Sequence, residues 1–244
     1  LILAAGRGPR MRPLTARLPK PLLPAGGAPF LEHQLHALAE AGVKRVVVLV
    51  GYRMRKVHEA LGDGQRFGLE LEYLVQEEQL GTGHAVAQAA GELDSEFFCL
   101  NGDTLVTTET LRALAAATGE HALAVAQVAD CSSYGLVKTR KGKLASIIEK
   151  GAEGPGKINA GIYRFAPSIF EALEALDDGK HRLLEYGVSD DAAFAPASVA
   201  ALTASGLRSK ARTSWPAFAR LAHMPEPILP RPIKAIVVML ASPR

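Results

Sequence analysis

The first 27 residues constrain the fold more than any other stretch of the chain. Residues 1–5, LILAA, form a short apolar run that is typical of a buried strand. A turn follows at once, in which Gly6 and Gly8 can adopt backbone conformations that let a ligand approach the main chain. Five cations lie in or just after this turn: Arg7, Arg10, Arg12, Arg17 and Lys20. A backbone cradle followed by Arg and Lys indicates a polyphosphate ligand.

Two common phosphate-binding loops are excluded in this segment. A dinucleotide-binding fingerprint needs a glycine where Met11 stands, and a P-loop needs Gly-Lys-Ser/Thr at the start of a helix. The segment also contains five prolines, which disfavour a helix directly after the turn: Pro9, Pro13, Pro19, Pro21 and Pro24. A surface turn with solvated arginines is the alternative interpretation of the segment by itself.

The segment as a whole resembles the signature of the sugar-1-phosphate nucleotidyltransferases, a strand followed by G-x-G-T-R-M-x-P-L-T and then P-K-P. The matching residues are Gly6, Gly8, Arg10, Met11, Pro13, Leu14, Thr15, Pro19, Lys20 and Pro21. One position departs from the pattern, because Pro9 stands where the family usually has Thr or Ser, and proline has no N–H to donate to a phosphate.

This resemblance implies roles for residues of the strand and the turn. The implied nucleotide-binding residues are Leu3, Ala4, Ala5, Gly6 and Gly8. The implied catalytic residues are the cations Arg10 and Lys20, which would stabilise the triphosphate and the leaving pyrophosphate.

The segments that follow alternate between strands and helices. We expect helices at 29–41 and 53–61 and strands at 45–50 and 69–75. The strand at 45–50 is apolar at every position after Arg45, which is typical of a strand buried on both faces. Further strands are expected at 96–100, 121–128 and 157–165, helices at 84–90, 107–118 and 167–176, and a hairpin from 134–137 and 143–150. This order predicts an α/β fold with an open, mostly parallel central sheet, helices on both faces and a β-hairpin annex.

Residues 76–90, QEEQLGTGHAVAQAA, form the second informative stretch. Gly81 and Thr82 lie between a predicted strand and an apolar helix, where a turn offers N–H groups and a hydroxyl to a polar ligand. A plain helix N-cap at Thr82 is the alternative. In the family this place binds the nucleobase, and Gln-Leu-Gly-Thr-Gly-His-Ala is similar to enzymes that use a uridine nucleotide. The resemblance therefore implies base contacts from Gln76, Gly81 and Thr82.

Asn101, Gly102 and Asp103 directly follow a predicted buried strand. Open α/β sheets bind ligands at the carboxyl ends of their strands, and a carboxylate there suits Mg²⁺, which keeps several waters and bridges to phosphates. An Asx turn that ends the strand is the alternative. By the resemblance, Asp103 is the metal ligand and Gly102 contacts the sugar.

The predicted hairpin region and the strand after it carry three more motifs. The family has Tyr-Gly, Glu-Lys and Asn-Ala-Gly-Ile-Tyr in this order on its sugar-binding side, and this chain has them in the same order. An interior glycine in a strand often marks close approach of a ligand or another backbone. The resemblance implies sugar-binding roles for Gly135, Glu149 and Asn159, and ordinary hairpin and bulge positions are the alternative.

The composition changes near the end of the chain. Residues 207–244 contain seven Lys or Arg, one Glu and six of the 15 prolines, and the family's second metal-ligand motif, Trp-x-Asp-x-Gly, is not found there. We therefore divide the chain into a nucleotidyltransferase domain at 1–206, with a nucleotide half at 1–130 and a sugar half at 131–206, and a basic, proline-rich tail at 207–244. This tail has three alternative explanations: a divergent end, a reading-frame error, or a basic arm for an acidic partner. We favour the reading-frame error. A strand is expected at 233–240.

Composition narrows the expected partners and location. Hydrophobic residues make up 48% of the chain, which predicts a packed globular core, and a net charge of +3 does not indicate nucleic-acid binding. We see no run of about eighteen apolar residues and no signal peptide, so we expect no membrane partner. Cys99 and Cys131 suit reduced thiols in a cytoplasmic protein. Because the chain does not begin with Met, we expect that a few residues precede it.

The motifs cover about residues 1–176, and the resemblance implies a reaction. A nucleotidyl group would pass from an NTP, with UTP favoured, to N-acetylglucosamine 1-phosphate or glucose 1-phosphate, with Mg²⁺ as cofactor and pyrophosphate as product. The alternatives are a thymidylyl- or guanylyltransferase of the same family and a non-catalytic relative that binds a sugar nucleotide. The expected partners are the NTP and the sugar 1-phosphate, and a homo-oligomer is one possibility.

Overall fold

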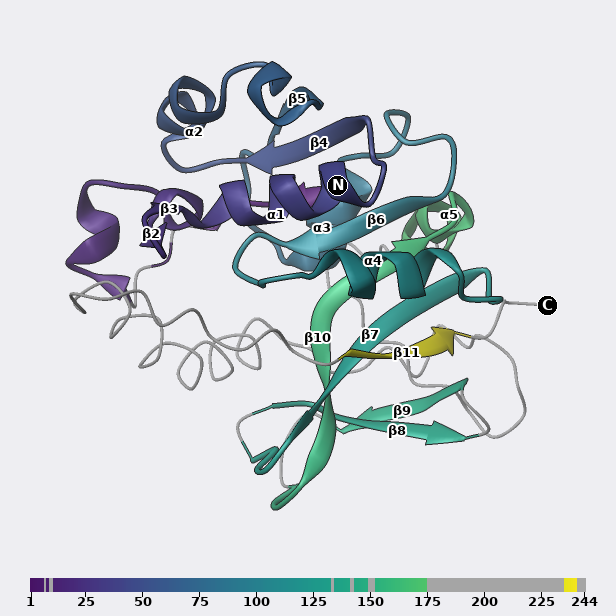
Figure 1. The fold of residues 1–244 in the computed structure, drawn as a ribbon. Coiled ribbons are helices and arrows are strands. Elements are labelled where there is room, and N and C mark those ends of the chain that lie inside the picture. The colour runs from purple at the N-terminus through teal and green to yellow at the C-terminus, as the bar shows by residue number, and fades with distance from the viewer. Residues whose placement is uncertain are drawn as a thin grey trace.

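The computed structural model describes residues 1–6, 8, 11–132, 134–140, 143–148 and 152–174, and the backbone of 235–240 (Figure 1). The strands are β1 (Ile2–Leu3), β2 (Pro24–Ala25), β3 (Ala28–Pro29), β4 (Arg45–Val50), β5 (Glu70–Val75), β6 (Phe97–Asn101), β7 (His121–Val128), β8 (Leu136–Arg140), β9 (Lys143–Ile148), β10 (Gly156–Phe165) and β11 (Ala235–Leu240). The α-helices are α1 (Phe30–Glu40), α2 (Met54–Leu61), α3 (Thr82–Ala87), α4 (Thr108–Ala115) and α5 (Ser168–Glu174). Short 3₁₀ turns are η2 (Leu14–Ala16), η3 (Lys20–Leu22) and η4 (Gln65–Phe67).

Nine strands of the described part form one open sheet in the order β5-β4-β1-β6-β10-β7-β11-β9-β8. Strands β5, β4, β1 and β6 are parallel, as the alternation of strands and helices predicts. From β6 onward the sheet is mixed, since β10 is antiparallel to both β6 and β7, and β8 and β9 form the predicted hairpin. Figure 1 shows β7 and β10 running from the central sheet to this hairpin. The predicted fold class is therefore confirmed, with the parallel pairing concentrated in the first half.

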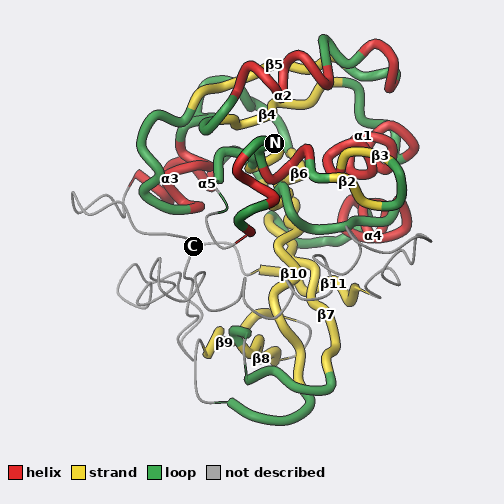
Figure 2. Tube along the Cα trace, turned by 90° about the vertical axis from the view of Figure 1, so that its left-hand side faces the viewer, coloured by secondary structure: helices red, strands yellow, loops and turns green. Residues whose placement is uncertain are grey.

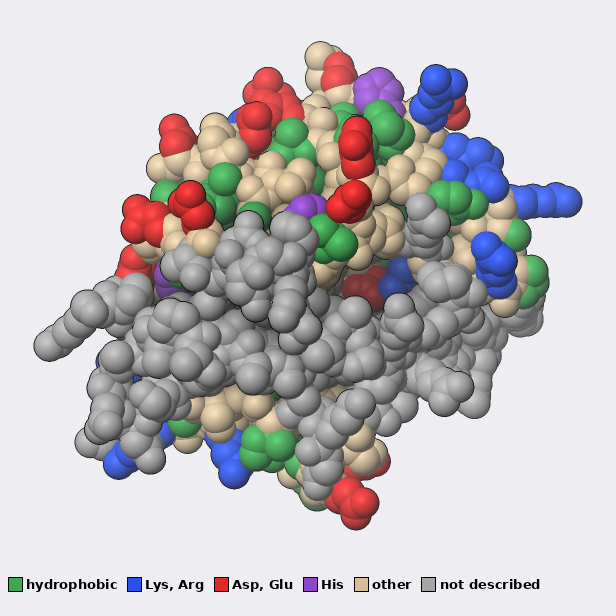
Figure 3. All heavy atoms as spheres, turned by 180° about the vertical axis from the view of Figure 1, so that it is seen from behind, with side chains coloured by type: hydrophobic (Ala, Val, Ile, Leu, Met, Phe, Trp, Pro, Cys, Tyr) green, Lys and Arg blue, Asp and Glu red, His purple; other side chains and the backbone are tan. Residues whose placement is uncertain are grey.

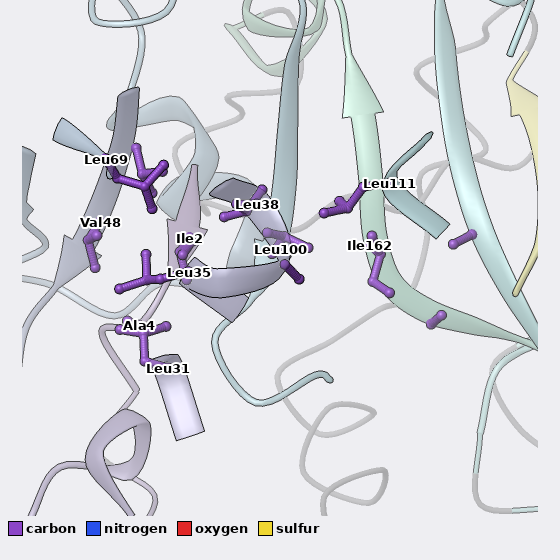
Figure 4. Packing of buried hydrophobic residues seen from close by; sticks show 14 of the residues in the cluster. Ile2, Ala4, Leu31, Leu35, Leu38, Val48, Leu69, Leu100, Leu111 and Ile162 are labelled. Atoms are coloured by element: carbon purple, nitrogen blue, oxygen red, sulfur yellow. The ribbon is translucent and has the colours of Figure 1, made fainter. Parts of the chain in front are cut away.

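Two apolar clusters cover the two faces of the sheet. One packs α1, α2 and α4 against the sheet, with Leu35 beside Ile2 (Figure 4) and Leu61 of α2 in the same cluster. The other packs α3 and α5, with Val86 and Ile169, against the opposite face. Figure 2 shows α3 and α5 on one side of the strands and α1 and α4 on the other. The predicted helices on both faces are confirmed.

Strand β4 shows why a continuous apolar run predicts a strand covered on both faces. Successive side chains of a strand point to opposite faces of the sheet. Val46, Val48 and Val50 belong to the cluster with α1 and α2, and Val47 and Leu49 belong to the cluster with α3 and α5. Five consecutive residues are therefore buried, and the pattern 45–50 has no polar side.

The expected strand at 233–240 is found as β11, whose place in the sheet the sequence does not predict. It pairs antiparallel with β7 from Ala235 opposite Ala126 to Leu240 opposite His121. The rest of the predicted tail and the predicted boundary at 206 lie outside the described residues. Within the part of the chain that the structure describes, no helix has the length and apolarity needed to cross a bilayer.

Hydrogen bonds between neighbouring strands align their carboxyl ends at one edge of the sheet. The Ala4 N–H donates to the Leu49 carbonyl at 2.8 Å, and the Gln76 N–H donates to the Val50 carbonyl at 2.8 Å. On the other side of β1, the Gly102 N–H donates to the Leu3 carbonyl at 3.0 Å. Three motifs that are far apart in the sequence therefore meet at this edge.

Candidate active site

A pocket of about 250 Å³ opens where β1, β5 and β6 end. It is lined by Leu3, Ala4, Ala5, Gly6, Lys20, Pro21, Leu49, Gln76, Gln79, Gly81, Thr82, Ala85, Asn101, Gly102 and Asp103. The carboxyl ends of parallel strands are where open α/β sheets bind their ligands. The position and the lining make this pocket the candidate active site.

Most of the residues selected from the sequence line this pocket. These are Leu3, Ala4, Ala5, Gly6, Lys20, Gln76, Gly81, Thr82, Gly102 and Asp103. Gly8, Gly135 and Asn159 are described but are not among its lining residues, and Arg10 and Glu149 lie outside the described residues. The structure thus brings the nucleotide-side residues and the predicted metal ligand together. Of the residues from this region expected to hold the sugar, the two that the structure describes, Gly135 and Asn159, are not part of the pocket wall.

The loop after β1 folds back on itself at Gly8. This residue has a φ of 56°, a left-handed conformation that favours glycine, and its carbonyl accepts hydrogen bonds from the Met11 N–H at 3.0 Å and the Thr15 hydroxyl at 2.8 Å. Because this carbonyl accepts two hydrogen bonds from within the loop, the role of Gly8 that the structure shows is to form the turn.

Helix α2 ties the far end of this loop in place. Arg53 donates to the carbonyls of Ala16 and Arg17 at 2.8 and 2.9 Å, and Lys56 donates to the Arg17 carbonyl at 2.9 Å. Figure 3 shows several Lys and Arg side chains together at the upper right of the back face, while Asp and Glu side chains are more frequent at its upper left and both kinds occur near the bottom.

Lys20 and Asp103 meet in the pocket although they are 83 residues apart. Lys20 opens η3 after Pro19, Asp103 follows β6, and the Nζ of Lys20 forms an ion pair with Oδ2 of Asp103. The side chains keep 19% and 41% of their surface exposed, so both remain accessible to a ligand in the pocket. The pair puts one positive and one negative group beside the backbone of the first motif.

Gln76 and the start of α3 form the opposite wall. Gln76 is buried, and its Nε2 lies 2.9 Å from Nδ1 of His84, so the imidazole orients the amide. Gly81 is the N-cap of α3 and no side chain caps the helix. The alternative of Thr82 as an N-cap is therefore wrong, and Thr82, the first residue of α3, lines the pocket.

Two lining residues that the sequence did not single out are polar. Gln79 spans from the loop after β5 to the end of β1, where its Nε2 donates to the Ala5 carbonyl at 2.5 Å. Asn101 is the last residue of β6. A polar residue between a strand and the Gly-Thr turn was the available signal for Gln79. The signal for Asn101 was its place beside Gly102 and Asp103.

Asn159 lies in a bulge of β10, where the pairing with β7 shifts between Asn159 and Tyr163. Its Oδ1 accepts from the Gly161 N–H at 2.8 Å and its Nδ2 donates to the Tyr163 hydroxyl at 2.8 Å. Gly161 has a φ of 71°, and the side chain of Asn101 lies against it. The interior glycine therefore marks a close approach, but the group that approaches is the side chain of the pocket residue Asn101 and not a ligand or another backbone.

The pocket contains one carboxylate, that of Asp103, among the described residues. The part of the chain that the structure describes holds no group of three or more His, Cys, Asp or Glu side chains that could bind a metal. Mg²⁺ is often held by one or two carboxylates together with substrate phosphates and waters. The donor set thus fits a Mg²⁺ ion that binds together with a phosphorylated ligand.

The thiol next to this site is not a nucleophile. Cys99 lies on β6 and is fully buried, and burial raises the pKa of its thiol to about 12. Because the thiolate is the reactive form, this residue is an inert core side chain near pH 7.

Comparison with known proteins identifies the family. Residues 1–190 match the family model described as nucleotidyl transferase. The chain belongs to the nucleotidyl transferase family. It is 34% identical over 179 residues to the mannose-1-phosphate guanylyltransferase of Mycobacterium tuberculosis, which covers 71% of this chain and 50% of the relative. It is also 34% identical over 184 residues to the bifunctional protein GlmU of Methanococcus vannielii, covering 72% and 42%. The chain therefore spans half or less of the length of these curated relatives.

Solved structures agree with this family. A putative glucose-1-phosphate thymidylyltransferase from Bacillus anthracis superposes with a TM-score of 0.68 at 25% identity, over 75% of this chain and 77% of that one. HddC from Yersinia pseudotuberculosis superposes with a TM-score of 0.61 at 28% identity, over 70% and 77%, and its structure is also known in complex with GMP-PN. The resemblance found in the sequence motifs is confirmed.

Proposed function

We propose that this chain transfers a nucleotidyl group from a nucleoside triphosphate to a sugar 1-phosphate and releases pyrophosphate. The observation that carries the proposal is the pocket that unites the backbone of Leu3–Gly6 with Lys20 and Asp103. Membership of the family supports it. The names of the relatives support it as well. Two of them name a nucleotidyltransferase and its sugar 1-phosphate, and the third is the bifunctional protein GlmU.

In this proposal the protein acts by positioning and by stabilising charge. A phosphate oxygen of the sugar 1-phosphate attacks the α-phosphorus of the NTP, and the bond from that phosphorus to the bridging oxygen of pyrophosphate breaks. Lys20 stabilises the negative charge of the triphosphate and of the leaving pyrophosphate, and the family motif assigns the same role to Arg10. Asp103 would hold Mg²⁺, which when bound neutralises charge on phosphate oxygens.

For the base we propose uridine, with Gln76, Gly81 and Thr82 as its contacts. The support is the Gln-Leu-Gly-Thr-Gly-His-Ala sequence, the position of these three residues in the pocket, and the GlmU relatives. Guanosine is the second candidate, because the Mycobacterium relative is a guanylyltransferase and HddC was solved with GMP-PN. For the sugar we propose N-acetylglucosamine or glucose, held with the help of Gly102, Gly135, Glu149 and Asn159.

Pyrophosphate release tests this function. The chain is incubated with Mg²⁺ and each pair formed from UTP, GTP or dTTP with the 1-phosphate of N-acetylglucosamine, glucose or mannose. We expect release with UTP and one of the first two sugars, and release with GTP and mannose 1-phosphate would replace uridine by guanosine. Asp103→Asn serves as the control that abolishes release. If no pair releases pyrophosphate although a UDP-sugar binds, the non-catalytic relative becomes the better description.

The location and assembly follow from the same proposal. Nucleoside triphosphates and sugar phosphates are cytoplasmic metabolites, so we propose a cytoplasmic protein whose partners are these two substrates. We propose neither a nucleic-acid nor a membrane partner, and size-exclusion chromatography with light scattering tests whether the chain forms a homo-oligomer.

A further inference from the structure

Helix α1 carries one polar side chain on its buried face. Gln34 is fully buried between Leu31, Leu35 and Leu38 of the same helix. Its Nε2 donates to two backbone carbonyls, that of Asn101 at 2.8 Å and that of Thr104 at 2.5 Å. These carbonyls stand on either side of Gly102 and Asp103. The amide of Gln34 therefore links helix α1 to the turn at 101–104, which carries Asp103.

An amide group is suited to this place for a chemical reason. The two carbonyls can accept two N–H donors that come from one point, and the NH₂ of glutamine supplies both. The oxygen of the same amide is unsatisfied, because Oε1 of Gln34 is buried and has no hydrogen-bond partner in the described part of the chain. A buried acceptor without a partner lowers stability, so an apolar side chain would serve packing as well or better. What Gln34 contributes is the placement of the turn.

The other contacts of the turn leave little freedom except at Asp103. The Gly102 N–H donates to the Leu3 carbonyl at 3.0 Å, and a Cβ at Gly102 would lie 2.7 Å from that oxygen. The Thr104 N–H donates to the Asn101 carbonyl at 3.1 Å, which closes the turn. Gln34 binds the two carbonyls at its ends, so these contacts together fix the backbone of the turn from which the Asp103 side chain projects. That carboxylate is the exposed group of the turn.

We infer that Gln34 is a positioning residue for Asp103, which holds the carboxylate in the place where it meets Lys20 and, with phosphates bound, Mg²⁺. This inference rests on the proposed function for the role of Asp103. It goes beyond that function in assigning a task to a buried helix residue that touches neither substrate. Groups that orient a metal ligand from behind typically change metal affinity or activity 10–100-fold when they are removed.

The test uses Gln34→Met, which keeps the length of the side chain and removes both donors. We expect the Mg²⁺ concentration for half-maximal pyrophosphate release to rise about 10-fold or more, measured with the NTP and sugar 1-phosphate that support turnover. A second readout needs no turnover. Amide hydrogen exchange at Gly102–Thr104, followed by mass spectrometry without substrates, should become faster in the variant, because the turn has lost its anchor.

Two further variants complete the test. Leu35→Val removes packing from the neighbouring position of α1, where the side chain belongs to the cluster with Ile2 and Val48. It should lower the melting temperature without changing the Mg²⁺ requirement or the exchange at the turn. Gln34→Glu keeps the shape but supplies at most one donor, so it should change both readouts in the same direction as Gln34→Met, and it replaces that variant if Gln34→Met does not fold.

The outcomes separate this inference from the proposed function. An unchanged Mg²⁺ requirement and unchanged exchange at Gly102–Thr104 would overturn the role of Gln34 even in an active enzyme. If the wild-type chain releases no pyrophosphate, the proposed function fails, and exchange alone decides whether Gln34 anchors the turn. Equal effects of Leu35→Val and Gln34→Met on both readouts would reduce Gln34 to a packing residue.

Discussion

Replacing Gly161 by alanine changes the contact between β10 and the pocket in two ways. The backbone at this position has a φ of 71°, which costs an L-residue about 1–2 kcal/mol. The new Cβ would also lie 3.0 Å from Cγ of Asn101 and closer still to its amide nitrogen, so the side chain of this pocket residue has to move. Inserting a methyl group into such a packed contact costs about 1–3 kcal/mol more.

Gly68→Ala provides a matched control for the backbone term. Gly68 has a φ of 72° and nothing within 4 Å of the place where a Cβ would be. The two glycines therefore share the same positive φ, and only Gly161→Ala adds the contact with Asn101. We expect the free energy of unfolding to fall by about 1–2 kcal/mol for Gly68→Ala and by about 2–5 kcal/mol for Gly161→Ala. For a chain of this size each kcal/mol lowers the melting temperature by about 2–4 °C.

Urea denaturation followed by circular dichroism measures these differences, and a double-mutant cycle assigns the excess to its cause. In Asn101→Ala the amide group that the new Cβ meets is removed and only the Cβ of residue 101 remains, 3.3 Å away, so Gly161→Ala in that background should cost little more than Gly68→Ala. Pyrophosphate release should fall in Gly161→Ala but not in Gly68→Ala, because the side chain displaced in Gly161→Ala is that of Asn101, which lines the pocket. Equal destabilisation by Gly161→Ala and Gly68→Ala would refute the reasoning.

Three further results are expected. Lys20→Met should lower kcat/KM for pyrophosphate release about 10²–10³-fold. It should change the unfolding free energy by less than about 1 kcal/mol, because the ion pair with Asp103 is partly exposed. A large loss of stability would contradict this. Burial lowers the pKa of His121, whose Nδ1 accepts from the Ala166 N–H. The neutral imidazole of His121 therefore contributes fully to stability above the unfolded-state pKa of about 6.5, and this contribution is lost as the pH falls through the lower folded-state pKa. In urea titrations at pH 7.5 and 5.5, the unfolding free energy of His121→Asn should depend less on pH than that of the wild type. Arg164→Met should lower the unfolding free energy by about 2–4 kcal/mol, because its buried guanidinium donates to the carbonyls of Leu114, Ala117 and Gly119; an unchanged melting temperature would contradict it.

The elements that could be predicted from the sequence are those that local pattern determines. The run at 45–50 coincides with β4 and the strand at 121–128 coincides with β7, because 46–50 and 121–126 are buried without interruption, as expected of strands covered on both faces. The helix expected at 84–90 begins two residues earlier, at Thr82, since a glycine at the N-cap needs no capping side chain that a pattern would reveal. The place of β11 beside β7 could not be predicted, because pairing between distant strands depends on the register of backbone groups.

The same distinction explains which site residues were found. Lys20, Gln76 and Asp103 carry chemistry that stands out in a motif. Gln34 was overlooked because it occupies one position in an apolar helix face, and its meaning depends on two carbonyls about seventy residues further along the chain. Asn159 was selected from a motif, but its amide is engaged within the bulge of β10, so its role toward a sugar stays a prediction.

The strand order explains why three distant motifs form one pocket. Strand β1 lies between β4 and β6, and the chain proceeds from β1 to β4 and β5 on one side before it returns to β6 on the other. The loops after β1 and β6 therefore leave the sheet in diverging directions, which opens a crevice at the carboxyl end of β1, the topological switch point where such sheets bind ligands. The loop after β1 supplies Lys20, the loop after β6 supplies Asp103, and the two side chains close the crevice by meeting across it. Under the proposed function, a phosphate bound at Lys20 and a Mg²⁺ ion bound at Asp103 would each compete with this ion pair for its partner.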